Sequence, residues 1–189
     1  MKPEVTVYCG SAANLAADYL EAARALGREL AGRGACLVTG AGRTGMMGAV
    51  ADAALAAGGQ VKGIIPQFMV DRGWHHSGLT EMVVTPDMHS RKELMAQSQA
   101  CIALPGGIGT FEELCEIITW RQLGLFHGNV VIYNVNDYYG PLLSMLAKAV
   151  EQGFMRPDHT SIYRVASSAA EAADMALARP ADTNYSPKF

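Results

Sequence analysis

Short apolar runs rich in β-branched residues alternate with longer stretches of helical periodicity along most of the chain. Seven such runs predict strands at 5–9, 35–39, 61–65, 82–84, 100–104, 130–134 and 162–165. Apolar residues point to both faces of these strands, as in Val130-Val131-Ile132-Tyr133, so helices must cover the sheet on both sides. This alternation is typical of parallel βαβ units. We therefore expect an α/β fold: a single Rossmann-like, doubly wound domain with a mostly parallel sheet covered by helices on both faces.

The length and the absence of internal breaks predict one domain. The chain has 189 residues, half of them apolar, which suffices for one core. No linker or repeat interrupts the pattern before residue 178, so we expect the domain to span residues 1–178. The stretch 179–189, which contains Pro180 and Pro187, is predicted to be a loosely ordered C-terminal tail.

The composition limits the classes of partner that the protein can be expected to bind. A net charge of −3 with 17% charged residues does not predict a nucleic-acid binder, and no apolar run is long enough to predict a membrane span. The four cysteines lack C-x-x-C spacing and resemble the reduced core thiols of a cytoplasmic protein. The adjacent His75 and His76, after Trp74, lack metal-ligand spacing and are interpreted as loop surface or pocket rim. We expect a small-molecule partner, with no metal and no cofactor.

The most informative motif is the segment 105–113, Pro-Gly-Gly-Ile-Gly-Thr-Phe-Glu-Glu, which joins a predicted strand to a predicted helix. Glycines let a ligand approach the backbone closely, and a helix N-terminus attracts anions, so the segment predicts a phosphate pocket. Thr110 and Glu113 also have capping-box spacing, which would need no substrate. Glu112 and Glu113 lie about 100° apart on a helix, so spacing leaves open which of them points into the pocket.

A second glycine loop, Gly40-Ala41-Gly42-Arg43-Thr44-Gly45, matches G-x-G-x-x-G. It follows the second predicted strand, and the next strand ends without the Asp or Glu that would bind a ribose, so NAD binding is disfavoured. Arg43 lies where a helix dipole disfavours a cation, which suggests an anion between them. Contact with a nucleotide and simple tight packing of strand on helix both remain open for this loop.

A third segment, 87–95, places Arg91 and Lys92 near the start of a predicted helix. Asp87 or Ser90 could cap that helix, and both cations could simply face water. Alternatively they clamp a phosphate or ribose, for which the planar donor fork of Arg91 is better suited than a lysine. Because loops at the carboxyl ends of parallel strands share one edge, we expect four loops to meet in one crevice: 10–11, 40–45, 66–67 and 106–110.

The two motifs taken together, at 105–113 and Met88-His89-x-Arg91-Lys92-x-x-Met95, resemble those of the Lonely Guy (LOG) family, many of whose members were once labelled lysine decarboxylases. The likeness covers most of the chain, including Asn134-Val135-x-x-Tyr138-Tyr139. It implies a homodimeric phosphoribohydrolase that splits the N-glycosidic bond of a nucleoside 5′-monophosphate, such as AMP or a cytokinin riboside 5′-monophosphate. The products would be the free base and ribose 5-phosphate.

The resemblance makes Arg91 and Glu113 the catalytic pair. The resemblance and the expected crevice together predict a substrate-binding set: Gly10, Ser11, Gly42, Arg43, Thr44, Gly45, Lys92, Met95, Gly106, Gly107, Ile108, Gly109, Thr110, Glu112 and Thr119. The chain departs from the family at Ala41, where a glycine is common, at Gly73, where a Glu is frequent, and in a spacing from Arg91 to Pro105 that is one residue short. The alternative interpretation is a non-catalytic carrier of a phosphorylated ligand, such as a molybdenum cofactor.

Overall fold

The computed structural model describes residues 2–180. All seven predicted strands are present, with no end shifted by more than one residue: β1 (Glu4–Tyr8), β2 (Cys36–Thr39), β3 (Gln60–Pro66), β4 (Glu81–Thr85), β5 (Ala100–Ala103), β6 (Asn129–Tyr133) and β7 (Tyr163–Ala166). They form one sheet in the order β4-β3-β2-β1-β5-β6-β7, and every pairing is parallel. The predicted tail lies outside the described residues from position 181 onward.

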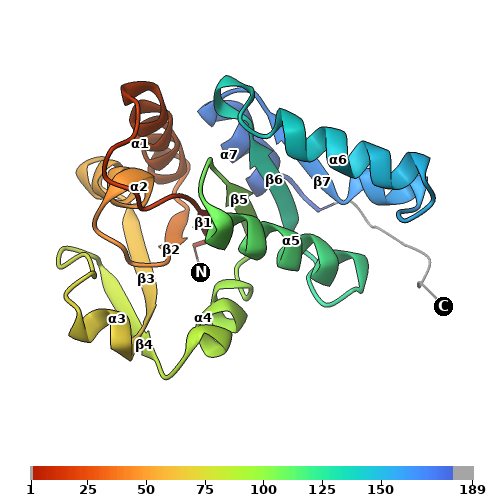
Figure 1. Ribbon diagram of the computed structural model, residues 1–189. Coiled ribbons are helices and arrows are strands. Elements are labelled where there is room, and N and C mark those ends of the chain that lie inside the picture. The colour runs from red at the N-terminus through yellow and green to blue at the C-terminus, as the bar shows by residue number, and fades with distance from the viewer. Residues whose placement is uncertain (1, 181–189) are drawn as a thin grey trace.

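Helices connect the strands in the predicted alternation (Figure 1). They are α1 (Ala17–Gly32), α2 (Gly45–Ala56), α3 (Gln67–Asp71), α4 (Met88–Met95), α5 (Ile108–Gln122), α6 (Gly140–Glu151) and α7 (Ala169–Leu177), with the 3₁₀ helices η1 (Val135–Asp137) and η2 (Pro157–Ser161). The chain therefore has the predicted α/β, Rossmann-like architecture.

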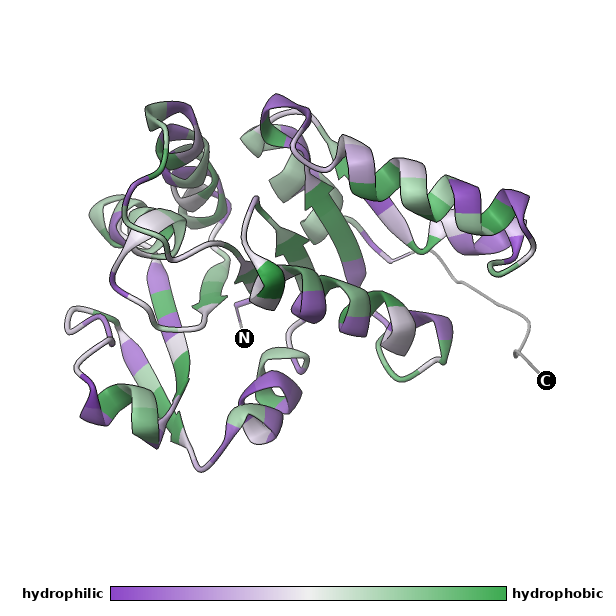
Figure 2. Cartoon of the chain, in the orientation of Figure 1, coloured by the Kyte–Doolittle hydropathy of each residue, from purple (hydrophilic) through white to green (hydrophobic). Residues whose placement is uncertain are grey.

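Alternate residues of each central strand enter two different cores. On β6, Val131 and Tyr133 pack with α1, α2 and α7, whereas Val130 and Ile132 pack with α4 and α5. Figure 2 accordingly shows β5 and β6 apolar along most of their length. This two-sided burial explains why the strands are nearly continuous apolar runs, and it confirms the prediction that helices cover both faces.

The strand order reverses direction next to β1, which has β2 on one side and β5 on the other. In doubly wound sheets, ligands bind outside the carboxyl ends of the strands at such a switch point. Gly10 follows β1 and Gly106 follows β5, and the two turns touch because the Gly10 amide donates to the carbonyl of Pro105 at 3.0 Å. A Cβ on Gly10 would lie 3.2 Å from the Gly106 Cα, so the contact depends on glycine. The fold thus creates a crevice beside the glycine-rich turn.

Candidate functional site

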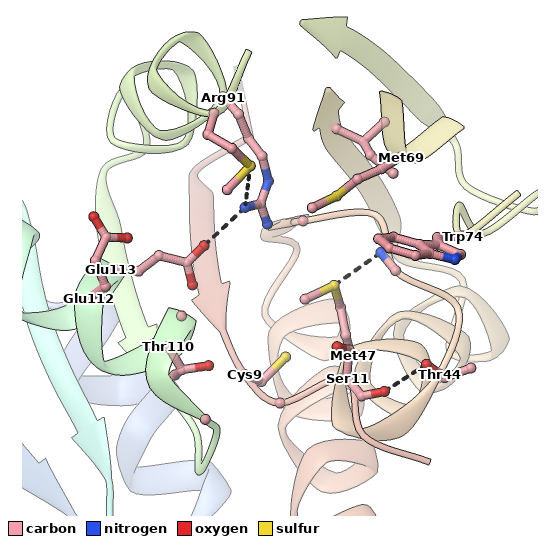
Figure 3. A pocket seen from close by; sticks show the side chains of 17 residues that line it. Cys9, Ser11, Thr44, Met47, Met69, Trp74, Arg91, Thr110, Glu112 and Glu113 are labelled. Carbon is pink, nitrogen blue, oxygen red and sulfur yellow. Dashed lines mark hydrogen bonds and ion pairs between the residues drawn. The ribbon is translucent and has the colours of Figure 1, made fainter. Parts of the chain in front are cut away.

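A cavity of about 550 Å³ opens at the carboxyl ends of β1, β2, β3 and β5 (Figure 3). The turns after β1, β2 and β5 meet here as predicted, whereas β3 and the segment after it contribute Ile65 and Met69 instead of residues 66–67. The cavity is lined by Cys9, Gly10, Ser11, Gly40, Gly42, Thr44, Met47, Ile65, Met69, Trp74, Met88, Arg91, Gly107, Gly109, Thr110, Glu112 and Glu113. Residues from distant parts of the chain therefore share one site.

Arg91 is held in a fixed position in the wall of this cavity. Its side chain comes from the second turn of α4 and is only 7% exposed. The Nε donates to the carbonyl of Ile64 at 3.1 Å, which attaches the guanidinium to the end of β3. A Cβ on Gly40 would lie 2.0 Å from Nη2, so glycine at that position makes room for the guanidinium. One face of the planar group is thus anchored, and Nη1 reaches across the cavity.

Glu113 on α5 is the partner that Nη1 reaches. The Arg91 Nη1 and Glu113 Oε1 atoms are 3.3 Å apart, and the glutamate side chain is 10% exposed. Burial raises the pKa of the Glu113 carboxyl, and the neighbouring Arg91 charge offsets part of that increase. The carboxylate points into the cavity beside the Arg91 fork (Figure 3). A raised pKa means that this carboxyl holds its proton to a higher pH than a free glutamate does, which suits it to acid–base chemistry.

The structure distinguishes the two glutamates that spacing could not. Glu112 is half exposed at the cavity rim, and its carboxylate pairs with the Lys92 ammonium. Lys92 also contacts Glu116 at 3.0 Å, so its charge is directed to the outer side of α5. Lys92 does not line the cavity. Glu113 is therefore the carboxylate that shares the cavity with Arg91.

The structure excludes the capping box that the spacing of Thr110 and Glu113 had left open. Helix α5 begins at Ile108, its N-cap is Gly107, and no side chain caps it. Thr110 lies inside the first turn, and a Cβ on Gly106 would fall 2.1 Å from the Thr110 hydroxyl. Because the first N–H groups of a helix have no intrahelical partner, this uncapped end presents free donors and a partial positive charge beside the cavity.

Three consecutive amides of the second glycine loop, those of Ala41, Gly42 and Arg43, donate to other atoms of the protein. The Ala41 amide donates to the Thr39 hydroxyl at 3.1 Å, the Gly42 amide to the Met47 sulfur at 3.0 Å, and the Arg43 amide to the Trp74 carbonyl at 3.3 Å. Ala41 has a φ of 60°, the left-handed conformation for which glycine is favoured. The loop shapes the wall of the cavity, and these contacts favour the packing interpretation over an anion site.

The remaining predicted residues differ in their relation to the cavity. Gly10, Ser11, Gly42, Thr44, Gly107, Gly109, Thr110 and Glu112 line it, whereas Arg43, Gly45, Lys92, Met95, Gly106, Ile108 and Thr119 do not. Thr119 is exposed, and its hydroxyl donates to the Cys115 carbonyl. Met95 is buried in the core, and Ile108 is 84% exposed. The α4 cap is Asp87, which accepts from the Ser90 amide at 2.8 Å, so Ser90 does not cap that helix.

Four apolar side chains form part of the cavity wall, and Met69 and Trp74 among them lie across the cavity from Thr110 on α5 (Figure 3); the sequence predicted few of these residues. Met47, Met69, Met88 and Trp74 line it, and the Arg72 guanidinium lies 5.0 Å from the centre of the Trp74 ring. The methionines come from three helices, so no local pattern relates them. The loop carrying Trp74 had been interpreted as surface or pocket rim, and the structure places this indole in the rim. One side of the cavity therefore suits an anion, and the other suits an apolar group.

Among residues 2–180, there is no group of three or more His, Cys, Asp or Glu side chains arranged to hold a metal ion. Within the same range, no helix has the length and apolar character that crossing a bilayer requires.

Fold and site define a Rossmann-like α/β protein with a small-molecule cavity at the switch point of its sheet. A family described as "Possible lysine decarboxylase" matches residues 47–176, and the chain belongs to this family, the LOG family. The cytokinin riboside 5′-monophosphate phosphoribohydrolase of Rhodococcoides fascians is 46% identical over 156 residues, covering 81% of this chain and 78% of that protein. The Arabidopsis thaliana enzyme of the same name, LOG1, is 45% identical over 168 residues, covering 88% and 79%.

Solved structures with the same architecture come from proteins of a different description. The Moco carrier protein of Chlamydomonas reinhardtii superposes with a TM-score of 0.70 at 22% identity, covering 91% of this chain and 93% of that one. The molybdenum cofactor binding protein of Rippkaea orientalis has a TM-score of 0.69 at 23% identity, covering 90% and 93%. At this identity, the likeness establishes the fold and says nothing about the ligand.

Proposed function

We propose that this protein hydrolyses the N-glycosidic bond of a nucleoside 5′-monophosphate, releasing the free base and ribose 5-phosphate. The observation that carries the proposal is the Arg91–Glu113 pair, which faces one cavity together with the uncapped N-terminus of α5. Relatives at 45–46% identity are named as phosphoribohydrolases of a cytokinin riboside 5′-monophosphate, which supports the same reaction class.

The uncapped end of α5 is the proposed phosphate site. Gly107 and Gly109 line the cavity, and neither has any atom within 4 Å of where a Cβ would stand, so a phosphate can approach the backbone there. Free N–H donors and the helix dipole both favour a dianion at such an end. The 5′-phosphate would then hold the ribose between α5 and α4.

Glu113 and Arg91 are the proposed catalytic residues. Breaking the C1′–N bond leaves an oxocarbenium-like ribose, which a nearby carboxylate stabilises. As the C1′–N bond breaks, its electron pair goes to the departing base nitrogen, which takes up a proton from solvent. The oxygen of the attacking water bonds to C1′ while Glu113 accepts a proton from that water and later releases it to solvent, so one water molecule is consumed. Arg91 orients the ribose or phosphate with a donor fork that its bond to Ile64 holds rigid. No step of this scheme requires a metal or a redox cofactor.

The methionine and tryptophan side chains that line the cavity indicate which base the site would prefer. Met47, Met69, Met88 and Trp74 offer polarisable, apolar contacts opposite the phosphate site. Such a wall supports a base with an apolar N6 substituent in preference to unsubstituted adenine, so AMP would be the poorer substrate. Replacing Met69 with Gln should reduce the ratio of kcat/KM for N6-isopentenyladenosine monophosphate to kcat/KM for AMP.

We also propose that the protein is a homodimer. Helix α6 has no fully buried residue, although Leu142 and Leu143 pack partly buried against the core, and large apolar side chains on it, after it and after α5 are exposed. Met145 is 66% exposed, Phe154 is 85% exposed and Leu125 is 67% exposed. Burying such residues against a second copy would stabilise the assembly. Sedimentation equilibrium of the wild type and of Met145→Asp tests this, because the variant should shift the equilibrium toward monomer.

Release of free base tests the proposed reaction. Purified protein is incubated with AMP, GMP, CMP, UMP and N6-isopentenyladenosine monophosphate, with the parent nucleosides as controls, and the base is measured by chromatography. We expect base from a nucleotide and much less from its nucleoside. Arg91→Ala and Glu113→Gln should each lower kcat/KM by about 10²- to 10⁴-fold. A carrier would bind the nucleotide without turnover, and that result would refute the hydrolase proposal.

A further inference from the structure

The turn after β6 presents two adjacent tyrosines to the glycine-rich turn after β5. Asn136 and Asp137 adopt left-handed φ values of 50° and 55°. The Asn134 side chain holds this turn: its amide nitrogen donates to Asp137 at 2.9 Å, and its oxygen accepts from the Tyr139 amide at 2.7 Å. Asn and Asp tolerate this backbone conformation better than most residues. The turn therefore fixes where Tyr138 and Tyr139 point. Neither tyrosine has a role in the proposed reaction.

Both tyrosine hydroxyls donate to carbonyls of the turn that leads into α5. The Tyr138 hydroxyl donates to the carbonyl of Gly106 at 2.5 Å, and the Tyr139 hydroxyl donates to the carbonyl of Leu104 at 2.8 Å. The carbonyl between them, that of Pro105, accepts from the Gly10 amide. Three successive carbonyls of this turn are thus held by hydrogen bonds, so the orientation of its peptide planes is set.

The bond from Tyr138 determines where the Gly107 N–H points. The described peptide bonds are all trans, so the carbonyl of Gly106 and the N–H of Gly107 point in opposite directions. Gly107 lines the main cavity, whereas Tyr138 does not. Tyr138 and Gly106 instead border a smaller cavity of about 210 Å³ behind the turn, which Gly107 also touches, so Gly107 lies between the two cavities. Holding the carbonyl on the Tyr138 side therefore directs the amide hydrogen toward the main cavity.

Tyr139 provides a matched comparison in the same turn. The carbonyl that it holds, that of Leu104, belongs to the peptide bond with Pro105, which has no N–H. The bond from Tyr139 therefore fixes the turn but does not orient any backbone N–H group. The two tyrosines also differ in burial, since Tyr138 is 37% exposed and Tyr139 is 1% exposed.

We infer that Tyr138 is a positioning residue for the substrate phosphate: its hydroxyl orients the Gly106–Gly107 peptide so that the Gly107 amide donates to a phosphate oxygen. The inference rests on the proposed function, because it assumes that the phosphate binds at the N-terminus of α5. The ring of Tyr138 is held separately, stacked on Phe111 with centroids 6.2 Å apart. Removing only the hydroxyl should therefore leave the ring in place.

The experiment compares Tyr138→Phe with Tyr139→Phe in the full chain. Calorimetry measures the dissociation constant of ribose 5-phosphate, with adenine as the phosphate-free control ligand, and urea unfolding measures stability. Tyr138→Phe should weaken ribose 5-phosphate about tenfold, as expected for a misaligned hydrogen bond to a charged group. Adenine affinity should not change, and the nucleotide KM should rise more than kcat falls. Tyr139→Phe should lower stability, because a buried carbonyl loses its donor, while leaving ribose 5-phosphate affinity at the wild-type value.

Three outcomes would overturn the inference: wild-type affinity in Tyr138→Phe, equal losses of affinity in both variants, or no binding of ribose 5-phosphate to the wild type. Failure of the proposed reaction is distinguishable from these. A wild-type protein that binds ribose 5-phosphate but releases no base contradicts the hydrolase proposal. The two variants would still decide the role of Tyr138, because the binding measurement does not depend on turnover.

Discussion

Replacing Gly40 with alanine should displace the Arg91 guanidinium without altering either member of the proposed catalytic pair. The new methyl carbon would lie 2.0 Å from Nη2 and 3.1 Å from Cζ. Ordinary contact begins at 3.4 Å, so the terminal nitrogen must retreat by about 1.4 Å. Because Nη1 belongs to the same rigid plane, its 3.3 Å approach to Glu113 must change as well.

The size of the effect follows from that displacement. A misplacement of about 1 Å in a catalytic arrangement costs roughly 10²-fold in rate, which corresponds to about 2.7 kcal/mol. The free energy of unfolding should change by less than this. Gly40 does not have a positive φ, so alanine fits the backbone at this position. Alanine also reduces the conformational entropy of the unfolded chain, which stabilises the folded state by about 0.5–1 kcal/mol. Straining the bond from Arg91 to Ile64 costs about 1.5–3 kcal/mol. We expect a folded protein that is roughly 1–2 kcal/mol less stable.

The assay measures kcat/KM for base release together with urea unfolding. Gly32→Ala is the matched control, because its added methyl has no atom within 4 Å and lies at the end of α1, and it should leave kcat/KM unchanged. A folded Gly40→Ala protein with wild-type kcat/KM would refute the link between the guanidinium position and the rate. A Gly40→Ala chain that does not fold would refute the packing estimate.

Three further predictions concern the same site and the core behind it. Burial raises the pKa of Glu113 above its ordinary value of 4.5, so the acid limb of base release should lie above pH 4.5. For the same reason, the wild type should lose stability relative to Glu113→Gln as pH rises from 4.5 through the raised pKa, because the unfolded carboxyl ionises first; urea unfolding across a pH series measures this difference. Gly63→Ala should lower the free energy of unfolding by about 1–3 kcal/mol, because its methyl would lie 2.6 Å from the Ala41 Cβ; a Gly63→Ala protein of wild-type stability would contradict this. Thr6→Val should lower the thermal midpoint and cost about 1–3 kcal/mol, because the carbonyl of Met95 loses a buried donor at 2.7 Å; an unchanged midpoint would show that the bond is dispensable.

Much of the architecture was predictable because a strand buried on both faces is a nearly continuous run of apolar residues in the sequence. A strand such as β6 is covered on both sides, so Val130 to Tyr133 are all apolar, and no polar alternation competes with this signal. The glycine-rich turn was equally readable, since Gly10 and Gly106 can approach only without side chains. Helix boundaries were less predictable. Spacing left a Thr110 cap open, and the structure excludes it because Gly107 is the N-cap residue; two glycines near a helix start give no strong local signal.

The sequence by itself determined the parallel α/β fold and the glycine turn at 105–110, because apolar pattern and backbone freedom are properties of single residues and short spacings. The candidate roles of Arg91 and Glu113 came from the resemblance to the LOG family, since spacing and charge left other interpretations open. Only the tertiary structure decided which glutamate shares the cavity with Arg91. Spacing gives the angle between Glu112 and Glu113, whereas packing of α5 on the sheet decides which of them is buried. It also decided that the amides of Ala41, Gly42 and Arg43 donate to other protein atoms and that Tyr138 holds the turn before α5. Whether a donor is free depends on partners that the fold brings from elsewhere in the chain.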